Sequence, residues 1–424
     1  MAKAIFEVHI PDFESKALAW AQQFEQVCYL QSNGYQDEFS SIEATLAVEA
    51  TYIFESDTNT FEELEKFKTK HPKQWMFGFF GYDLKNQIED LTTSFPNPLQ
   101  FPNCYFFIPK TLIKFLKNSV EIDADSPEII FNAILDFKSD IETRVPSSKL
   151  NIQHRFSKEE YFDAFEHMIS HIRRGDIYEV NLCQEFFAEN AVINPFDVYQ
   201  KLNTISPTPF STFFKLNDKF ILSASPERFL AKRENTLISQ PIKGTAPRGK
   251  SIKEDQENIE QLRNNPKEIA ENVMIVDLVR NDMTRSALPG TVAAERKLEV
   301  HSFKQVHQLI STITCTISNE INDVLAIKNI FPPGSMTGAP KISAMKLCDR
   351  YENSRRGVYS GTVGYFSPSG DFDFNVIIRT ILYNQSQQYL SFHTGGAITI
   401  DAEAENEYNE CLLKASAIIQ TLQS

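Results

Sequence analysis

The sequence of 424 residues lacks several features that define other classes of protein. It contains no internal repeat, no low-complexity tract and no CxxC pair, and its cysteines do not fall at a metal-binding spacing. A disulfide framework or a zinc ribbon is therefore not expected. We predict reduced, structural thiols at all six cysteines: Cys28, Cys104, Cys183, Cys315, Cys348 and Cys411.

Long apolar runs and an excess of positive charge are also missing. No stretch approaches the roughly 18 apolar residues of a membrane span, and residues 1–20 do not resemble a secretory signal. Lysine and arginine total 42 against 56 aspartates and glutamates, which gives a net charge of −14. Nucleic acid and anionic membranes would repel such a chain. The sequence therefore predicts a cytoplasmic protein that binds neither.

The apolar content is sufficient for a large folded core. Hydrophobic residues make up 42% of the chain and aromatic residues 12%. Short aromatic strands dominate the first part of the chain, up to the polar segment 144–151. We predict an N-terminal subdomain over 1–150 that packs on a core over 151–424. The polar segment itself is either their border or a crossing on the surface of one larger unit.

Two predicted helices carry pairs of acidic residues. Asn265 and Pro266 are typical of a helix start, and Glu268 and Glu271 lie three residues apart on that helix. The C-terminal helix repeats the spacing with Glu407 and Glu410. In isolation, such pairs are usually solvated faces. Because carboxylate oxygens suit Mg²⁺, converging pairs could instead share a cation.

One short segment, QPIKGTAPRG at residues 240–249, places a lysine in a region rich in proline and glycine. Its prolines and glycines predict a tight turn from which the Lys243 side chain can reach outward. Upstream, Pro226 ends a predicted strand and presents Glu227, and a hairpin separates the two residues. Lys243 is either a solvated surface cation or, with Glu227, one half of an acid and nucleophile pair in one pocket.

Five segments in order resemble the motifs of the chorismate-utilising enzymes. They are SPERF (225–229), PIKGTAPRG (241–249), AENVMIVDLVRND (270–282), PPGSMTGAPKISAM (332–345) and GYFSPSGDFDFNVIIRT (364–380). The resemblance runs from about residue 154 to the C-terminus. It implies one α/β (α+β) unit of two stacked antiparallel sheets flanked by helices, with the active site between the sheets.

Within this family, the residue at position 243 separates the reactions. Anthranilate synthases usually carry alanine in the PI-x-GT segment, whereas lysine there is typical of aminodeoxychorismate synthase component I. The resemblance thus implies conversion of chorismate and ammonia to 4-amino-4-deoxychorismate, towards 4-aminobenzoate and folate. No segment resembles a glutaminase, so a separate glutamine amidotransferase subunit is expected to supply ammonia. The alternatives are anthranilate synthase component I, or a binding subunit without turnover.

The resemblance also implies roles for particular residues. Lys243 would add to the substrate ring as a neutral amine of lowered pKa, while a protonated Glu227 assists the leaving hydroxyl. Glu271 and Glu410 would bind Mg²⁺, supported by Glu268 and Glu407. Chorismate itself would be held by a further set of side chains and backbone amides: Tyr365, Arg379, Gly395, Gly396, Ala397, Thr337, His307 and Lys341.

The sequence departs from the family pattern at two positions. Ala397 replaces a usual glycine, which makes close approach of a ligand there less certain. Glu179 stands where the family commonly has glutamine, and where its water-adding members place a lysine. Because this chain has no lysine there, a water-adding reaction is not expected. Glu179 is either a neutral change or a substitute polar contact.

Overall fold

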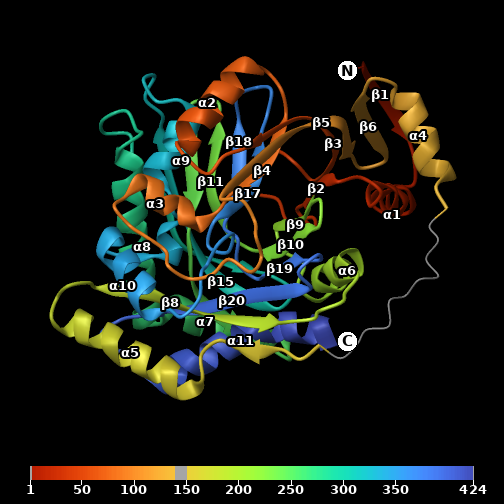
Figure 1. Ribbon diagram of the computed structural model, residues 1–424. Coiled ribbons are helices and arrows are strands. Elements are labelled where there is room, and N and C mark those ends of the chain that lie inside the picture. Colours follow the sequence, from red (N-terminus) through yellow and green to blue (C-terminus); the bar gives the residue numbers. More distant parts are fainter. Residues whose placement is uncertain (1, 139–149, 424) are drawn as a thin grey trace.

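The computed structural model describes residues 2–138 and 150–423 (Figure 1). Within these ranges twenty strands form one hydrogen-bonded network, and their pairings are antiparallel. The predicted segment 144–151 lies mostly outside the described residues. The division at residue 150 therefore stays a prediction, although strands from before and after it pair directly, as β2 does with β9 and β4 with β17.

The network forms two layers that share two long strands, β3 and β5. One layer runs from β8 at one edge to β1 at the other, with two short strands on the outer side of β8. In order, its strands are β7 (Gln153–His154) and β16 (Gly338–Ala339), β8 (Glu179–Ala188), β20 (Tyr389–Ile398), β19 (Thr380–Asn384), β10 (Lys219–Ser225), β9 (Phe210–Leu216), β2 (Gln26–Gln31), β3 (Ala44–Glu55), β5 (Cys104–Phe115), β6 (Ser119–Ala124) and β1 (Ala2–Glu7).

The second layer continues from the first half of β5. Its last three strands meet on β15, which pairs with β12 and β13 along one edge and with β14 along the other. In order, its strands are β4 (Met76–Phe80), β17 (Thr362–Phe366), β18 (Phe372–Asn375), β11 (Arg228–Arg233), β12 (Thr236–Gln240), β15 (Val306–Thr316), β13 (Ile242–Pro247) and β14 (Ala293–Ser302).

The main hydrophobic core lies between the two layers. Phe79 of β4 packs edge to face against Phe214 of β9, with ring centroids 5.6 Å apart. The next residue, Phe80, points the opposite way and contacts Phe61 of a covering helix. The alternation along β4 thus buries one face against the other sheet and the other face against helices. The predicted pair of stacked antiparallel sheets is confirmed, with the addition that shared strands join them.

Helices cover the outer faces of both layers (Figure 1). On the first layer lie α1 (Ile10–Ala21), α4 (Pro127–Asp136), α6 (Pro195–Ile205) and α11 (Ala404–Gln423), and near β8 lie α5 (Lys158–Arg173) and α10 (Lys341–Tyr351). The second layer is covered by α2 (Thr60–Lys70), α7 (Ile252–Asn264), α8 (Pro266–Thr284) and α9 (Asp323–Ile330). The remaining turns are η1 (Tyr82–Leu84), α3 (Lys85–Ile88) and η2 (Gly334–Met336).

The predicted start of α8 is confirmed, and α5 also begins with a capping motif. α5 begins with a capping box between Ser157 and Glu160, and α8 begins at Pro266 behind an Asn265 cap. The segment expected to be a turn around Lys243 is instead β13, which pairs with β15. Positive φ at Gly244, +86°, accompanies a register shift there, so the proline and glycine content marks a bulged strand.

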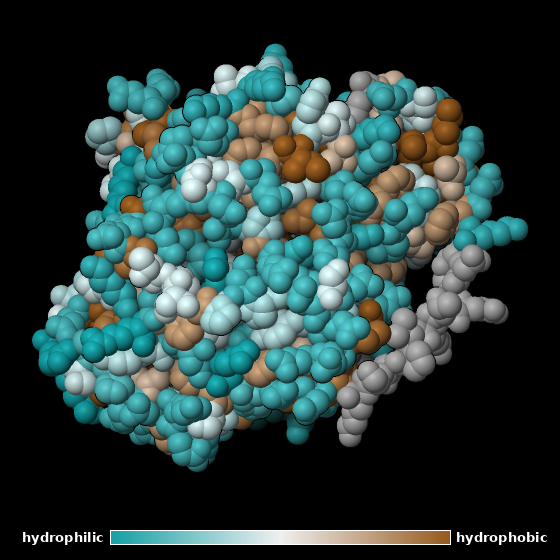
Figure 2. Space-filling model, viewed as in Figure 1, coloured by the Kyte–Doolittle hydropathy of each residue, from teal (hydrophilic) through white to brown (hydrophobic). Residues whose placement is uncertain are grey.

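The surface and the cysteines agree with the sequence. All six cysteines are free and buried. Figure 2 shows a face that is mostly hydrophilic, with apolar side chains scattered over it. None of the helices in the described ranges has the length and apolar character needed to span a bilayer.

Candidate active site

A cavity of about 600 Å³ opens where strands of both layers meet α8 and α11. It brings together most of the predicted site residues from distant parts of the chain. Those that line it are Glu227, Lys243, Glu268, Glu271, Arg379, Gly395, Ala397, Glu407 and Glu410.

Glu227 lies at the turn between β10 and β11, where Pro226 ends the strand. Its side chain is 4% exposed, and burial raises its pKa to about 7, against smaller opposing effects of the Ser335 hydroxyl, the Ile242 backbone and Lys243. A substantial fraction of Glu227 therefore carries a proton near neutral pH. The expectation of a protonated acid facing the cavity is consistent with this environment.

Lys243 points into the same cavity from β13 and is not a solvated cation. Its Nζ atom lies 2.6 Å from Oε1 of Glu179 on β8, and both side chains are largely buried. Burial alone would lower the pKa of Lys243, but the negative charges of Glu179, Glu271 and Glu227 outweigh burial and raise it. The predicted lowering of the Lys243 pKa is thus wrong for the free protein. Glu179, which the sequence left open, is a direct polar partner of Lys243.

The four predicted metal-binding acids face the cavity from two helices. Burial raises the pKa of Glu268 and Glu407, and raises that of Glu271 to about 7. At Glu410 the charge of Lys414 outweighs burial and lowers the pKa. The raised values show that burial disfavours the charged forms of Glu268, Glu271 and Glu407 more than the nearby lysines favour them.

The four carboxylates are ligands of a type that suits a hard cation, although they are not arranged as a complete coordination sphere. The Oε1 atom of Glu271 is buried and accepts no hydrogen bond. Lys267 lies between the helices, with Nζ 3.7 Å from Glu271 Oε1 and 3.2 Å from Glu407 Oε1. Over residues 2–138 and 150–423, no three His, Cys, Asp or Glu side chains stand close enough together to hold a metal ion. This buried carboxylate oxygen, which accepts no hydrogen bond, is nevertheless a suitable hard ligand.

Arg379 supplies a positive charge on another wall of the cavity. Its Nη1 donates to the backbone oxygen of Lys414 at 3.3 Å, and among the described residues it forms no ion pair. Burial lowers its pKa, which shows that its charge is poorly compensated. Tyr359 lines the cavity too, stacked on His393 with centroids 4.8 Å apart. A carboxylate ligand would compensate the guanidinium.

The glycine segment of β20 forms the floor of the cavity. A methyl group on Gly395 would come within 2.6 Å of Cys183 Sγ, and one on Gly396 within 2.6 Å of Glu407 Oε2. Gly395 and Ala397 line the cavity, whereas Gly396 faces Glu407 on α11. The alanine therefore does not close the cavity, while Gly396 permits the close approach of α11.

Besides Gly396, four predicted substrate-binding residues do not line the cavity. Thr337 is fully buried and donates to the backbone oxygen of Gly334. Lys341 is clamped by the backbone oxygens of Ile330 and Pro332, at 2.8 and 2.9 Å, and by Asp282. As placed, both residues hold the turn before α10 in shape. Their substrate contacts stay untested.

His307 and Tyr365 also lie outside the cavity, while Gln308 and Tyr359 line it. His307 contacts Ser302 and Asp255 on the far face of β15, whereas the next residue, Gln308, faces the cavity with an unpaired, buried Oε1 atom. Tyr365 lies away from Arg379, where Tyr359 stands instead. Period-two alternation along β15 could have pointed to Gln308, but the sequence held no signal that distinguished Tyr359 from Tyr365.

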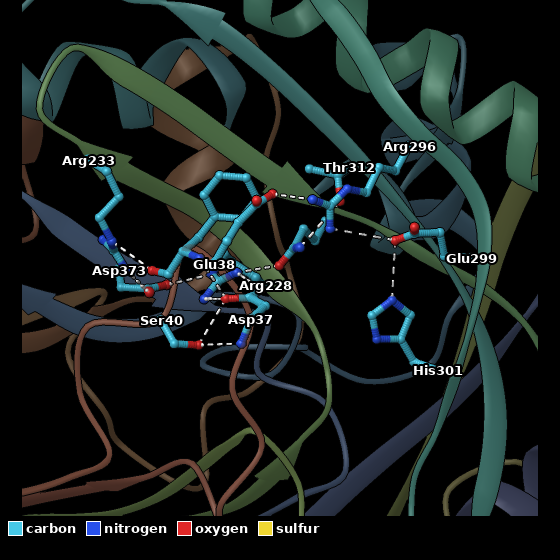
Figure 3. Close-up of polar contacts among 12 residues, drawn as sticks. Asp37, Glu38, Ser40, Arg228, Arg233, Arg296, Glu299, His301, Thr312 and Asp373 are labelled. Carbon is cyan, nitrogen blue, oxygen red and sulfur yellow. Dashed lines mark hydrogen bonds and ion pairs between the residues drawn. The ribbon is translucent and has the colours of Figure 1, made fainter.

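Tyr365 lines a second, smaller cavity of about 160 Å³. Its hydroxyl lies 2.5 Å from Ser41 Oγ, and burial raises its pKa to about 12. In the wall of this cavity, Arg228 lies between Asp37 and Asp373, at 2.6 and 3.1 Å (Figure 3). The charged groups here are thus paired with one another, unlike Arg379 in the larger cavity.

Comparison with known proteins identifies the class. The family model described as "chorismate binding enzyme" matches residues 17–420. The chain therefore belongs to the chorismate-binding enzyme family, which confirms the resemblance drawn from the motifs, and it is an enzyme of that family.

The chain is similar to two proteins named as aminodeoxychorismate synthases and to a solved structure named as an anthranilate synthase component I. Aminodeoxychorismate synthase component 1 of Klebsiella aerogenes is 34% identical over 82% of this chain and 77% of its own length. A probable chloroplastic aminodeoxychorismate synthase of Oryza sativa subsp. japonica is 38% identical over 71% of this chain, which spans only 34% of the rice protein. Anthranilate synthase component I of Streptococcus pneumoniae superposes with a TM-score of 0.79 at 27% identity, covering 91% of this chain and 94% of that structure.

Proposed function

We propose that the protein is aminodeoxychorismate synthase component I, which aminates chorismate at the carbon that carries the hydroxyl. The observation that carries the proposal is that Lys243 and the protonatable Glu227 line one cavity together with the unpaired Arg379. An amine, an acid and a carboxylate receptor are the groups that this reaction requires. The relatives named for the same reaction support the proposal.

In the proposed mechanism Arg379 binds the enolpyruvyl carboxylate of chorismate, with Tyr359 beside it. The neutral amine of Lys243 then bonds to the ring. As it does so, the ring hydroxyl leaves and takes the proton of Glu227, so that water departs. Ammonia attacks the carbon that lost the hydroxyl, and the bond to Lys243 breaks as the double bonds shift back. The product leaves as an ammonium, and Glu227 regains its proton from solvent.

Mg²⁺ is proposed as the cofactor that neutralises the ring carboxylate of chorismate. Glu271 and Glu410 would hold it, with Glu268 and Glu407 in support, and the buried Oε1 atom of Glu271, which accepts no hydrogen bond, favours this. Glu410→Gln should raise the Mg²⁺ concentration needed for half-maximal activity by roughly tenfold. The control is the exposed Glu403→Gln on the loop before α11. An unchanged Mg²⁺ dependence in Glu410→Gln would remove this cofactor assignment.

We also propose that a glutamine amidotransferase subunit supplies the ammonia and that the protein works in the cytoplasm. The component name of the Klebsiella relative supports a separate partner. Co-purification with a candidate amidotransferase, followed by glutamine-dependent turnover, tests the partner. Turnover with ammonium alone, unchanged when the partner and glutamine are added, would contradict it.

The decisive test compares wild type with Lys243→Ala in chorismate turnover with Mg²⁺ and ammonium. We expect aminodeoxychorismate from wild type and a loss of at least about a thousandfold in the variant. Intact mass spectrometry of quenched wild type should show chorismate, less water, bound at Lys243. Anthranilate and pyruvate as products would instead favour anthranilate synthase component I, the reaction named for the Streptococcus structure.

A further inference from the structure

We infer that Glu179 is the proton partner of Lys243, which holds the amine in place and accepts the proton that it must lose before it can bond to chorismate. The inference rests on the proposed function, because it concerns how that nucleophile is prepared. It gives a task to a residue that differs from the glutamine common in the resembling family, since a glutamine side chain cannot accept this proton.

The geometry singles out Glu179 among the carboxylates near Lys243. Lys243 faces negative charge from four elements: Glu179 on β8, Glu227 after β10, Glu268 and Glu271 on α8, and Glu410 on α11. Only Glu179 forms a hydrogen bond with Nζ, at 2.6 Å, among the described residues. Proton transfer requires such a distance, so the remaining four act on Lys243 through their charge alone.

The surroundings of Glu179 favour the exchange. Its side chain is 1% exposed, and its second oxygen, Oε2, accepts no hydrogen bond. Strand pairing fixes its position, because Glu179 lies opposite Ala339 of β16 at the start of β8. A buried carboxylate with an unused oxygen can take up a proton without breaking other contacts. A buried ion pair can also neutralise itself by this transfer when a ligand excludes the remaining water.

The proposed step balances. One proton moves from the Lys243 ammonium to Glu179, which leaves a neutral amine and a neutral carboxylic acid. The amine bonds to the ring and becomes a secondary ammonium that keeps its two hydrogens, while the leaving hydroxyl takes the proton of Glu227. When ammonia displaces Lys243, the lysine leaves as a neutral amine and recovers its proton from Glu179. No oxidant or further reactant is needed.

The test measures the rate of Lys243 adduct formation against pH, with Mg²⁺ and chorismate but no ammonia, by intact mass of quenched full-length protein. In wild type the proton goes to Glu179, so the rate should change little below about pH 7 and should fall above it, as Glu227 loses the proton that the leaving hydroxyl needs. In Glu179→Gln the proton of Lys243 must go to solvent. We expect a rate at least about tenfold lower at pH 6 that rises by up to about tenfold per pH unit until Glu227 titrates.

Two further variants separate proton acceptance from structural damage. Glu179→Asp keeps a carboxylate at a longer reach, so it should be slower than wild type but retain the shape of the wild-type profile. Glu185→Gln removes another buried, ion-paired carboxylate on β8, bonded to Arg155, and should react as wild type does.

The outcomes distinguish the two proposals. A Glu179→Gln profile identical to that of wild type would overturn the role of Glu179, and so would a steep profile in Glu179→Asp. Absence of any Lys243 adduct in wild type would instead overturn the proposed function itself.

Discussion

The molecule contains two buried arginines near cavities, and their surroundings differ sharply. Arg228 contacts Asp37, Asp373 and Gln240. The negative charges of Asp37 and Asp373 raise the pKa of Arg228 in spite of burial. Arg379 has one backbone oxygen as its partner in the described protein, and burial lowers its pKa. A fully paired cation stabilises the fold, whereas a poorly compensated one is available to a ligand.

The same contrast extends to the groups around each arginine. Near Arg228, a neighbouring guanidinium, Arg233, also bonds Asp373, so that the cluster is closed on itself (Figure 3). Around Arg379, Glu271 and Gln308 keep buried oxygen atoms without hydrogen-bond partners. Unsatisfied buried polar atoms cost stability, so their concentration in one cavity indicates a binding site. Four predictions, described from the largest expected effect to the smallest, test this difference.

Arg228→Met should damage stability and leave substrate binding intact. Removing one partner of a buried ion pair exposes Asp37 and Asp373 to an unfavourable environment, and we expect a loss of about 3–5 kcal/mol in the free energy of unfolding. Chemical denaturation measures the loss. The KM for chorismate of the remaining folded enzyme should be unchanged, and a raised KM at full stability would reverse the assignment of the two arginines.

Arg379→Met should have the opposite signature. Loss of the carboxylate receptor should lower kcat/KM for chorismate roughly 100-fold, equivalent to about 3 kcal/mol of charge-assisted hydrogen bonding. The unfolding free energy should be unchanged or slightly increased, because a desolvated cation has been removed. Steady-state kinetics and denaturation of the same preparation provide both values. Destabilisation without a kinetic effect would show that Arg379 is structural.

Acid should weaken the Arg228 cluster in a defined pH range. The charge of Arg228 overcomes burial and lowers the pKa of Asp37 to about 2, from an ordinary value of 3.8. A carboxyl with a depressed pKa adds stability above its unfolded pKa, and that stability is lost as pH falls through the folded pKa. We expect Asp37 to contribute about 2 kcal/mol at neutral pH, lost between about pH 4 and 2. Asp37→Asn should flatten this part of the stability curve, and an unaltered acid limb would contradict the ion pair.

Gln308→Leu should show that the unsatisfied polar atoms of the cavity lower the stability of the free protein. Removing a buried, unpaired acceptor should stabilise the fold by about 1 kcal/mol and raise the KM for chorismate about fivefold. His307→Leu, one residue earlier, breaks contacts to Ser302 and Asp255 and should destabilise the fold with no change in KM. Equal kinetic effects of the two substitutions would contradict the placement of β15.

Local sequence patterns were sufficient to place the helices and the acidic pairs that they carry. Cap residues located the start of α8, and three-residue spacing placed Glu268 and Glu271 on one face of it. The pairing of two distant motifs, Glu227 and Lys243, came from the family resemblance together with the hairpin between them. Cap residues and residue spacing are local signals, and the family motifs are long, so these features can be recognised before the fold is known.

The predicted residues that lie outside the cavity include some whose position depends on strand geometry. Along β15 a shift of one residue exchanges the buried cavity for the opposite face, which separates Gln308 from His307. Tyr359, in the turn before β17, lines the larger cavity, whereas Tyr365, on β17 itself, lines the smaller one. The raised pKa of Lys243 depends on Glu179, a residue from another strand. The last two of these relations leave no periodic signal in the sequence.

The pairing of early strands with much later ones also affects how the chain can be made. β2 pairs with β9, with Val27 opposite Lys215, and β4 pairs with β17, with Gly78 opposite Gly364. In each pair the first strand is synthesised long before its partner. During synthesis the early strands therefore present unpaired edges, rich in aromatic side chains, until much later segments leave the ribosome. Such edges are templates for aggregation. We expect nascent chains of this protein to need chaperones, and separately expressed halves to be insoluble, for reasons unconnected with its chemistry.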